Sequence, residues 1–169
     1  MFFGVSSIGL IFHNKSTYMQ TFVCFIFAFI FGSFLEYWVH RLMHVSPIFG
    51  NKITGHYGHH RSNTSKGFIK DFLDFSLVSL LVLPAFFVSL SFGAIMISGT
   101  IAFAAFASYA HQIQHHNPHK CFWMKMPIHY IHHKNSQWDS NFGLAIDWWD
   151  MLFGTYKFVD VSSSSRKME

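Results

Sequence analysis

The sequence predicts an all-α integral membrane protein with three to four transmembrane helices and a helical cap on the cytoplasmic side. Of its 169 residues, 51% are hydrophobic and only 12% are charged, whereas soluble domains carry about 25% charged residues. Three apolar stretches are long enough to cross a bilayer, which takes about 20 residues in a helix. Eleven of the thirteen histidines fall into four clusters, each at a boundary between an apolar and a polar stretch.

The N-terminal segment, residues 1–12, is apolar but too short to span a membrane. It also lacks the basic residues that open a signal peptide, because Lys15 follows the segment instead of preceding it. We expect an interfacial or re-entrant helix here.

Three predicted spans follow. The first covers about residues 19–39 and is rich in phenylalanine, the second about residues 72–90, and the third about residues 92–110. Pro84 predicts a kink in the second span, which membrane helices tolerate. Ser91 and Gly93 supply the expected turn between the second and third spans, which therefore form a tight hairpin.

The hairpin returns the chain to the side of the membrane where the first span ends, so all four histidine clusters are expected on one side. Basic residues are enriched on the cytoplasmic side of membrane proteins. Only Lys15 lies on the opposite side. The other eleven basic residues accompany the histidines: Arg41, Lys52, Arg61, Lys66, Lys70, Lys120, Lys125, Lys134, Lys157, Arg166 and Lys167. The histidine side is therefore predicted to be cytoplasmic.

The length predicts a single domain over residues 1–160, followed by a disordered tail over residues 161–169. Within it, residues 111–160 are expected to form the cap, as short helices interrupted at Pro118 and Pro127. The isolated Cys24 and Cys121 predict neither a disulfide framework nor a zinc-thiolate site. This cysteine usage is typical of a protein whose functional side faces a reducing compartment.

The four clusters place histidines three to five residues apart. On a helix, side chains three and four residues apart share a face, and imidazole is the commonest transition-metal ligand. Ten or so imidazoles exceed what one ion can hold, so the count indicates two ions. The clusters are His40 and His44; His56, His59 and His60; His111, His115 and His116; and His129, His132 and His133.

Several neighbouring residues have two interpretations. Glu36 shares a helix face with His40. It is either a carboxylate solvated at the membrane boundary or an acceptor of a hydrogen bond from a ligand histidine. On a helix, His116 points away from His111 and His115, so those two are favoured as ligands over His116. Trp138, Trp148 and Trp149 are interpreted as anchors at the bilayer interface.

The four clusters, together with Asn141-Phe142-Gly143 and residues 149–156 (Trp-Asp-Met-Leu-Phe-Gly-Thr-Tyr), resemble the fatty acid hydroxylase / sterol desaturase superfamily. The resemblance runs from about Glu36 to Lys157, and the third and fourth clusters look most like those of fatty acid 2-hydroxylases. It implies a membrane-bound, non-haem di-iron oxygenase that uses O₂ and two electrons to hydroxylate a C–H bond of a lipid. The implied iron ligands are His40, His44, His56, His59, His60, His111, His115, His129, His132 and His133. Glu36, His116, Asn141 and Asp150 are expected around them.

The resemblance also implies partners and a location. The lipid substrate would come from the bilayer, and the electrons from a separate cytochrome b5-like or ferredoxin-like carrier, since no fused carrier domain fits before the first span. The membrane would be the endoplasmic reticulum in a eukaryote, or an inner or internal membrane in a bacterium. No nucleic-acid partner is expected.

Two alternatives stay open. A sterol or carotenoid hydroxylase, or a desaturase, would use the same kind of centre, because apolar residues do not select one lipid skeleton over another. A protein of another class, which transports or senses a metal ion, would need ionisable groups inside its spans. The predicted spans contain few such groups, which favours the enzyme.

Overall fold

The computed structural model describes residues 5–159, with side chains from residue 17 onward, and every regular element in this part of the chain is helical. The predicted fold class is therefore confirmed. The predicted tail, residues 161–169, lies outside the described residues. In chain order the elements are α1 (Val5–Val45), the π-helix η1 (Ile48–Ile53), α2 (His56–Ser62), α3 (Phe68–Ser76), the 3₁₀-helix η2 (Leu77–Phe87), α4 (Leu90–His116), the 3₁₀-helix η3 (Pro118–Lys120), α5 (Ile128–Lys134) and α6 (Trp148–Leu152).

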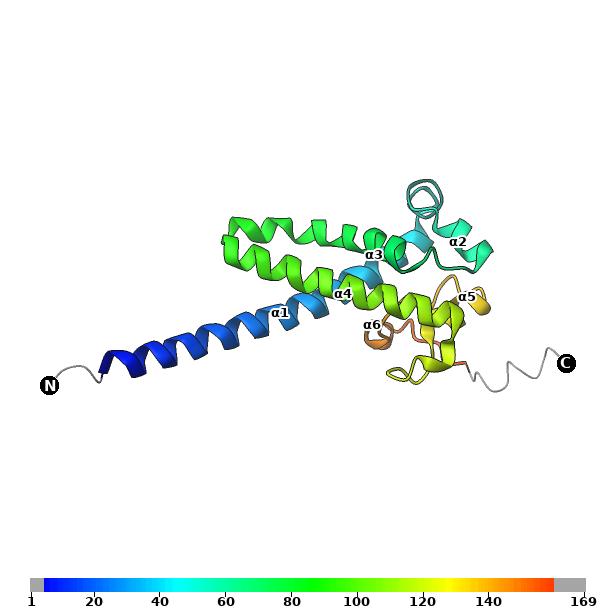
Figure 1. Cartoon of the computed structure of the whole chain (residues 1–169). Helices are drawn as coiled ribbons and strands as arrows, with labels where there is room; N and C mark the ends of the chain where they lie inside the picture. The colour runs from blue at the N-terminus through cyan, green and yellow to red at the C-terminus, as the bar shows by residue number, and fades with distance from the viewer. Residues whose placement is uncertain (1–4, 160–169) are drawn as a thin grey trace.

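Three long segments form the body of the molecule (Figure 1). Helix α1 packs obliquely against α4, and α3 with η2 runs back along α4 as the other arm of a hairpin. Two helices are long and apolar enough to cross a membrane, residues Thr17–Val45 of α1 and the whole of α4. The stretch predicted as the second span forms α3 and η2, whose winding changes from α to 3₁₀ at Leu77, so it is not one regular α-helix and is not among the two membrane-length helices.

Small residues allow the close approach of these segments. A Cβ atom on Gly99 of α4 would lie 2.5 Å from the Cβ of Ala28 on α1. A Cβ atom on Gly93 would lie 2.4 Å from the ring of Phe86 on η2. Both contacts are far below van der Waals separation, so glycine is required at these crossing points.

Two details of the predicted topology were wrong. Helix α1 continues without interruption from Val5 into the first span, so the described part of residues 1–12 is not a separate interfacial helix. The hairpin turns at Val88–Ser89, earlier than the predicted Ser91–Gly93, because the Ser89 hydroxyl accepts a hydrogen bond from the backbone N–H of Phe92 and so caps α4. Gly93 serves helix packing instead.

The predicted cap region contains the short helices η3, α5 and α6, with breaks at Asn117 and over residues 121–127, although α4 continues to His116 and so includes the first residues of this region. It lies at the end of the bundle opposite the hairpin turn, together with α2 (Figure 1). A hydrophobic cluster around Met126, Ile128 and Ile131 holds α5 in the cap, and Leu144 and Ala145 pack against Phe103 and Ala107 of α4. The cap is thereby anchored to the membrane-spanning helices.

Candidate metal centre

The histidines of the four clusters converge at the cap end of the bundle and form two groups. In each group the candidate ligand nitrogens all lie within 4.8 Å of one another. The first histidine group consists of His40, His44, His56, His60 and His132. The second histidine group consists of His59, His111, His115 and His129.

Helical geometry explains how four clusters yield two groups. His40 and His44 lie one turn apart on α1, and their Nε2 atoms are 3.3 Å apart. His111 and His115 are related in the same way on α4, with a separation of 3.1 Å. On α2 the consecutive residues His59 and His60 point about 100° apart, so they enter different groups.

Helix α5 likewise contributes to both groups, through His129 to the second and His132 to the first. His133 belongs to neither group by distance but lies against both. Its ring stacks on that of His60, with centroids 4.1 Å apart, and contacts the rings of His59 and His129 at 4.5 Å. Neither of its ring nitrogens has a hydrogen-bond partner among the described residues, although the side chain is only 7% exposed.

Three histidines of α2 and α5 are held neutral. Burial, followed by the proximity of other imidazoles, lowers the pKa of His59 to about 4 and that of His132 to about 3. Burial also lowers the pKa of His60 to about 4. Neutral imidazole is the form that binds metal ions.

Fixed tautomers turn the Nε2 atoms into acceptors. The Nδ1 of His59 donates to the carbonyl oxygen of Thr64 at 2.9 Å, and the Nδ1 of His111 donates to Asp71 at 2.7 Å. Their Nε2 atoms nevertheless face each other at 3.2 Å. Two lone pairs at this distance repel, because a neutral imidazole has only one N–H. A cation between them removes the repulsion, so these residues fit a bound metal ion.

The first histidine group has a similar outer layer. The Nδ1 of His132 donates to the carbonyl oxygen of Ser140 at 2.8 Å, and the Nδ1 of His40 donates to that of Phe142. The Nε2 of His132 then faces the Nε2 atoms of His44 and His60 at 3.0 and 3.2 Å. This arrangement of converging nitrogens also suits an ion better than a set of hydrogen bonds.

Nine of the ten histidines predicted as ligands therefore lie in the two groups, and His133 lies between them. That they bind metal stays a prediction. His116 is exposed on α4, where its Nε2 contacts the hydroxyl of Ser65 at 3.2 Å, and it lies outside both groups. His119 is also exposed.

The other residues expected around the ligands, Glu36, Asn141 and Asp150, form hydrogen bonds that hold the loop of residues 140–144. Glu36 is buried and accepts a hydrogen bond from the backbone N–H of Leu144 at 3.3 Å, and no hydrogen bond joins it to a histidine among the described residues. Asp150 accepts from the backbone N–H groups of Phe142 and Gly143 at 2.8 and 2.6 Å. The side chain of Asn141 exchanges hydrogen bonds with the backbone of Lys157. These bonds fix the loop whose carbonyl oxygens orient His40 and His132.

Sequence reasoning missed two residues that support the second histidine group. Asp71 accepts from His111, as described above, and Gln114 accepts from the backbone N–H of His129 at 2.8 Å. An ionisable residue at the edge of an apolar span is a recognised functional signal, and Asp71 carried that signal. Gln114 carried no such signal in the sequence, because the backbone N–H from which it accepts belongs to a different helix, α5.

A model of the fatty acid hydroxylase family matches residues 25–155. Comparisons with curated proteins and with solved structures gave no significant match. The family match covers most of the chain and includes every residue of both histidine groups. The chain therefore belongs to the fatty acid hydroxylase family, and its two long apolar helices and its family identify it as a membrane protein.

Proposed function

We propose that this member of the fatty acid hydroxylase family is a di-iron monooxygenase that hydroxylates a C–H bond in the acyl chain of a lipid. The observation that carries the proposal is the pair of converging histidine groups at one end of apolar, membrane-length helices. The reaction balances as R–H + O₂ + 2 e⁻ + 2 H⁺ → R–OH + H₂O. Two bound iron ions would supply the O₂ activation and C–H cleavage that no amino-acid side chain provides.

The chain's own residues hold the ions and set the donor strength of their ligands. Carbonyl oxygens of Thr64, Ser140 and Phe142 keep the proton of three imidazoles on Nδ1, so that Nε2 is free for the metal. Burial of His56, His129 and His132 excludes water from the ligands. Imidazole suits zinc and copper as well as iron, and iron is proposed because the family's chemistry is oxidative.

The substrate chain would approach from the membrane. A wholly apolar groove of about 240 Å³ follows α1 and is lined by Phe27, Ile30, Phe31, Phe34 and Trp149. Its lining matches an acyl chain, and it runs along the helix that carries His40 and His44. We propose that the acyl chain lies here, with the head group at the cap and oxidation near the head group. The same centre would serve a desaturase or a sterol hydroxylase, which product analysis distinguishes.

Electrons would enter at a second surface, between α2 and the segment that follows α5. A depression of about 410 Å³ is lined by Tyr57, His60, Arg61, Ser136 and Trp138. The Trp138 ring is 45% exposed, yet it stacks on the His60 ring at 5.0 Å and meets the His44 ring edge-on at 4.9 Å. We propose that a separate, acidic electron carrier docks here against the exposed Arg61, and that this surface is cytoplasmic.

The test combines metal analysis with product analysis. The protein is expressed with iron, purified in detergent and assayed for metal, and lipid extracts of cells with and without the gene are compared by mass spectrometry. We expect about two iron ions per chain and a lipid product heavier by one oxygen atom. His132→Ala should remove both, whereas His119→Ala, which alters an exposed histidine outside both groups, should remove neither. A folded protein that binds no iron under these conditions would refute the proposal.

A metal-transporting protein is the competing class. It is disfavoured because the histidines of both groups lie at one end of the spanning helices, and α4 holds no acidic or basic residue before His111. Uptake of metal ions into proteoliposomes that contain the protein would support transport instead.

A further inference from the structure

The hydrogen-bond acceptors of the histidine Nδ1 atoms differ in charge between the two histidine groups. In the first histidine group the outer acceptors of His40 and His132 are neutral peptide carbonyls. In the second histidine group the Nδ1 of His111 donates to the carboxylate of Asp71 at 2.7 Å. Among the described residues this is the one pairing between a carboxylate and a group histidine.

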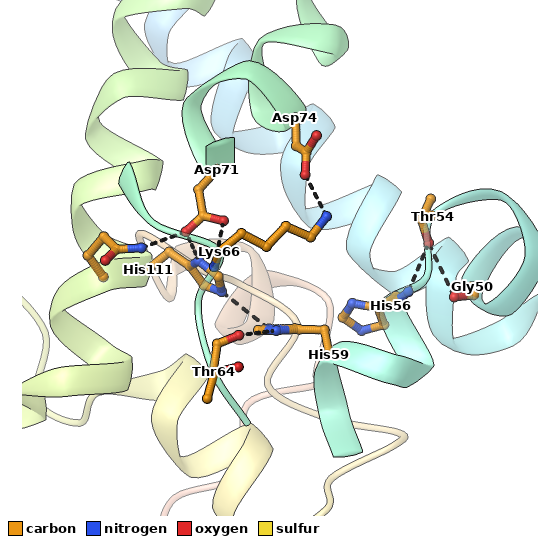
Figure 2. A network of polar contacts seen from close by, with 10 residues as sticks. Gly50, Thr54, His56, His59, Thr64, Lys66, Asp71, Asp74 and His111 are labelled. Atoms are coloured by element: carbon orange, nitrogen blue, oxygen red, sulfur yellow. Dashed lines mark hydrogen bonds and ion pairs between the residues drawn. The ribbon is translucent and has the colours of Figure 1, made fainter. Parts of the chain in front are cut away.

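Asp71 is buried and is held in place by several hydrogen bonds. It lies in the first turn of α3, is only 3% exposed, and also accepts hydrogen bonds from the side chain of Gln112 at 2.7 Å and from the backbone N–H of Lys66 at 3.3 Å. Figure 2 shows the carboxylate directed at His111, whose ring points on toward His59. All three partners hold the carboxylate in its charged form.

The connection between α2 and α3 links the two facing imidazoles. Thr64 accepts from the Nδ1 of His59, and Lys66, two residues later, donates to Asp71. The segment thus orients His59 directly and His111 through Asp71 (Figure 2). The Nε2 atoms that result lie 3.2 Å apart, where one ion can contact both.

We propose that Asp71 is a positioning residue that sets the metal affinity of the second histidine group and leaves that of the first unchanged. A carboxylate acceptor draws the Nδ1 proton and so increases the electron density at Nε2, which a neutral carbonyl does to a smaller degree. The two metal sites are therefore unequal. The inference rests on the proposed two-metal centre.

The test is a titration of metal-free protein in detergent with Co²⁺, followed by visible absorption. Asp71→Asn keeps the size of the side chain and removes its charge, and loss of such an outer partner costs about 10- to 100-fold in metal affinity. We expect one of two Co²⁺ ions to bind that much more weakly. Asp74→Asn is the matched control, because Asp74 lies on the same helix but pairs with the exposed Lys66. It should titrate like the wild type.

Introducing Asp71→Asn into two further variants identifies which of the two metal sites it weakens. In His56→Ala, which disables the first histidine group, Asp71→Asn should weaken the remaining ion. In His115→Ala, which disables the second, Asp71→Asn should change nothing. Equal weakening in both backgrounds, or in neither, would overturn the role of Asp71. If the wild type itself binds fewer than two ions, the proposed two-metal centre fails and this inference fails with it, whereas two ions in the wild type with no effect of Asp71→Asn would overturn this inference alone.

A second variant keeps the test decisive if Asp71→Asn does not fold. Gln112→Leu removes one of the hydrogen bonds that hold the Asp71 carboxylate and leaves every histidine in place. A smaller loss of Co²⁺ affinity, confined to the His56→Ala background, is expected. Unchanged affinity in a folded Gln112→Leu protein, or a loss of affinity that is equal in both backgrounds, would contradict the inference.

Discussion

His40 donates a hydrogen bond from Nδ1 to the carbonyl oxygen of Phe142, a residue 102 positions later in the chain. The bond joins the end of a membrane-spanning helix to the loop of residues 140–144. Ser140 in the same loop accepts from His132, so one loop orients histidines from α1 and from α5. The buried Asp150 holds this loop by accepting from the backbone N–H groups of Phe142 and Gly143.

Asp150→Asn should therefore disturb the first histidine group without changing a ligand. The amide nitrogen of asparagine would face a backbone N–H, leaving a buried donor unsatisfied at a cost of about 1–3 kcal/mol. We expect a lower melting temperature and weaker binding of one metal ion. Asp139→Asn is the control, since Asp139 is exposed and its one side-chain hydrogen bond within the described part of the chain is accepted from the Ser140 hydroxyl. Thermal unfolding and metal analysis measure both effects, and an unchanged Asp150→Asn protein would contradict them.

Gly143→Ala should be strongly destabilising. A Cβ atom at this position would lie 2.2 Å from the carbonyl oxygen of Ile146 and 2.8 Å from a carboxylate oxygen of Asp150. Overpacking of a tight interior costs about 1–3 kcal/mol. Gly58→Ala on α2 meets nothing within 4 Å and should be neutral or slightly stabilising, because alanine favours a helix. Denaturation of the two variants in detergent compares them directly, and equal stabilities would refute the role of Gly143.

The metal-free protein should lose stability below pH 6.5. In the folded state the pKa values of His59 and His60 are about 4, lowered first by burial, against about 6.5 in the unfolded chain. Between these values the unfolded state binds more protons, so the free energy of unfolding decreases as the pH falls. The contribution of these histidines to the free energy of unfolding should be fully present above pH 6.5 and should decrease as the pH falls through 4.

Melting temperatures of metal-free protein, measured from pH 8 to 4, test this dependence. The same acidification should release bound metal, because protons compete for the imidazole nitrogens. A melting temperature that is constant across the whole range would be the contrary result.

Trp138 should control how fast the centre accepts electrons. Trp138→Ala removes the ring that joins solvent to His60 and His44, so reduction by an external carrier should slow while metal content stays near that of the wild type. Trp138→Phe retains an aromatic ring and should be intermediate. Stopped-flow reduction of the loaded protein measures the rates. Trp148→Ala, which alters an exposed tryptophan of α6, is the control, and equal slowing in both variants would refute a specific role.

The helical membrane fold and the convergence of the histidines were accessible from the sequence, because both depend on local patterns. Hydropathy over about 20 residues indicates a spanning helix, and spacings of three and four indicate a shared helix face. The N-terminal helix and the hairpin turn were predicted less well. Local composition suggested a break after residue 12 and a turn at Gly93, but helix continuity and the Ser89 cap decided otherwise.

Only the tertiary structure decided how the histidines are divided. His59 and His60 are neighbours in the sequence, and so are His132 and His133, yet their partners come from helices whose relative placement no local pattern specifies. The outer acceptors show the same limit. Backbone carbonyls such as those of Ser140 and Phe142 have no signature in the sequence, because any residue supplies one. Their role arises when packing brings a loop to the end of a helix more than a hundred residues away.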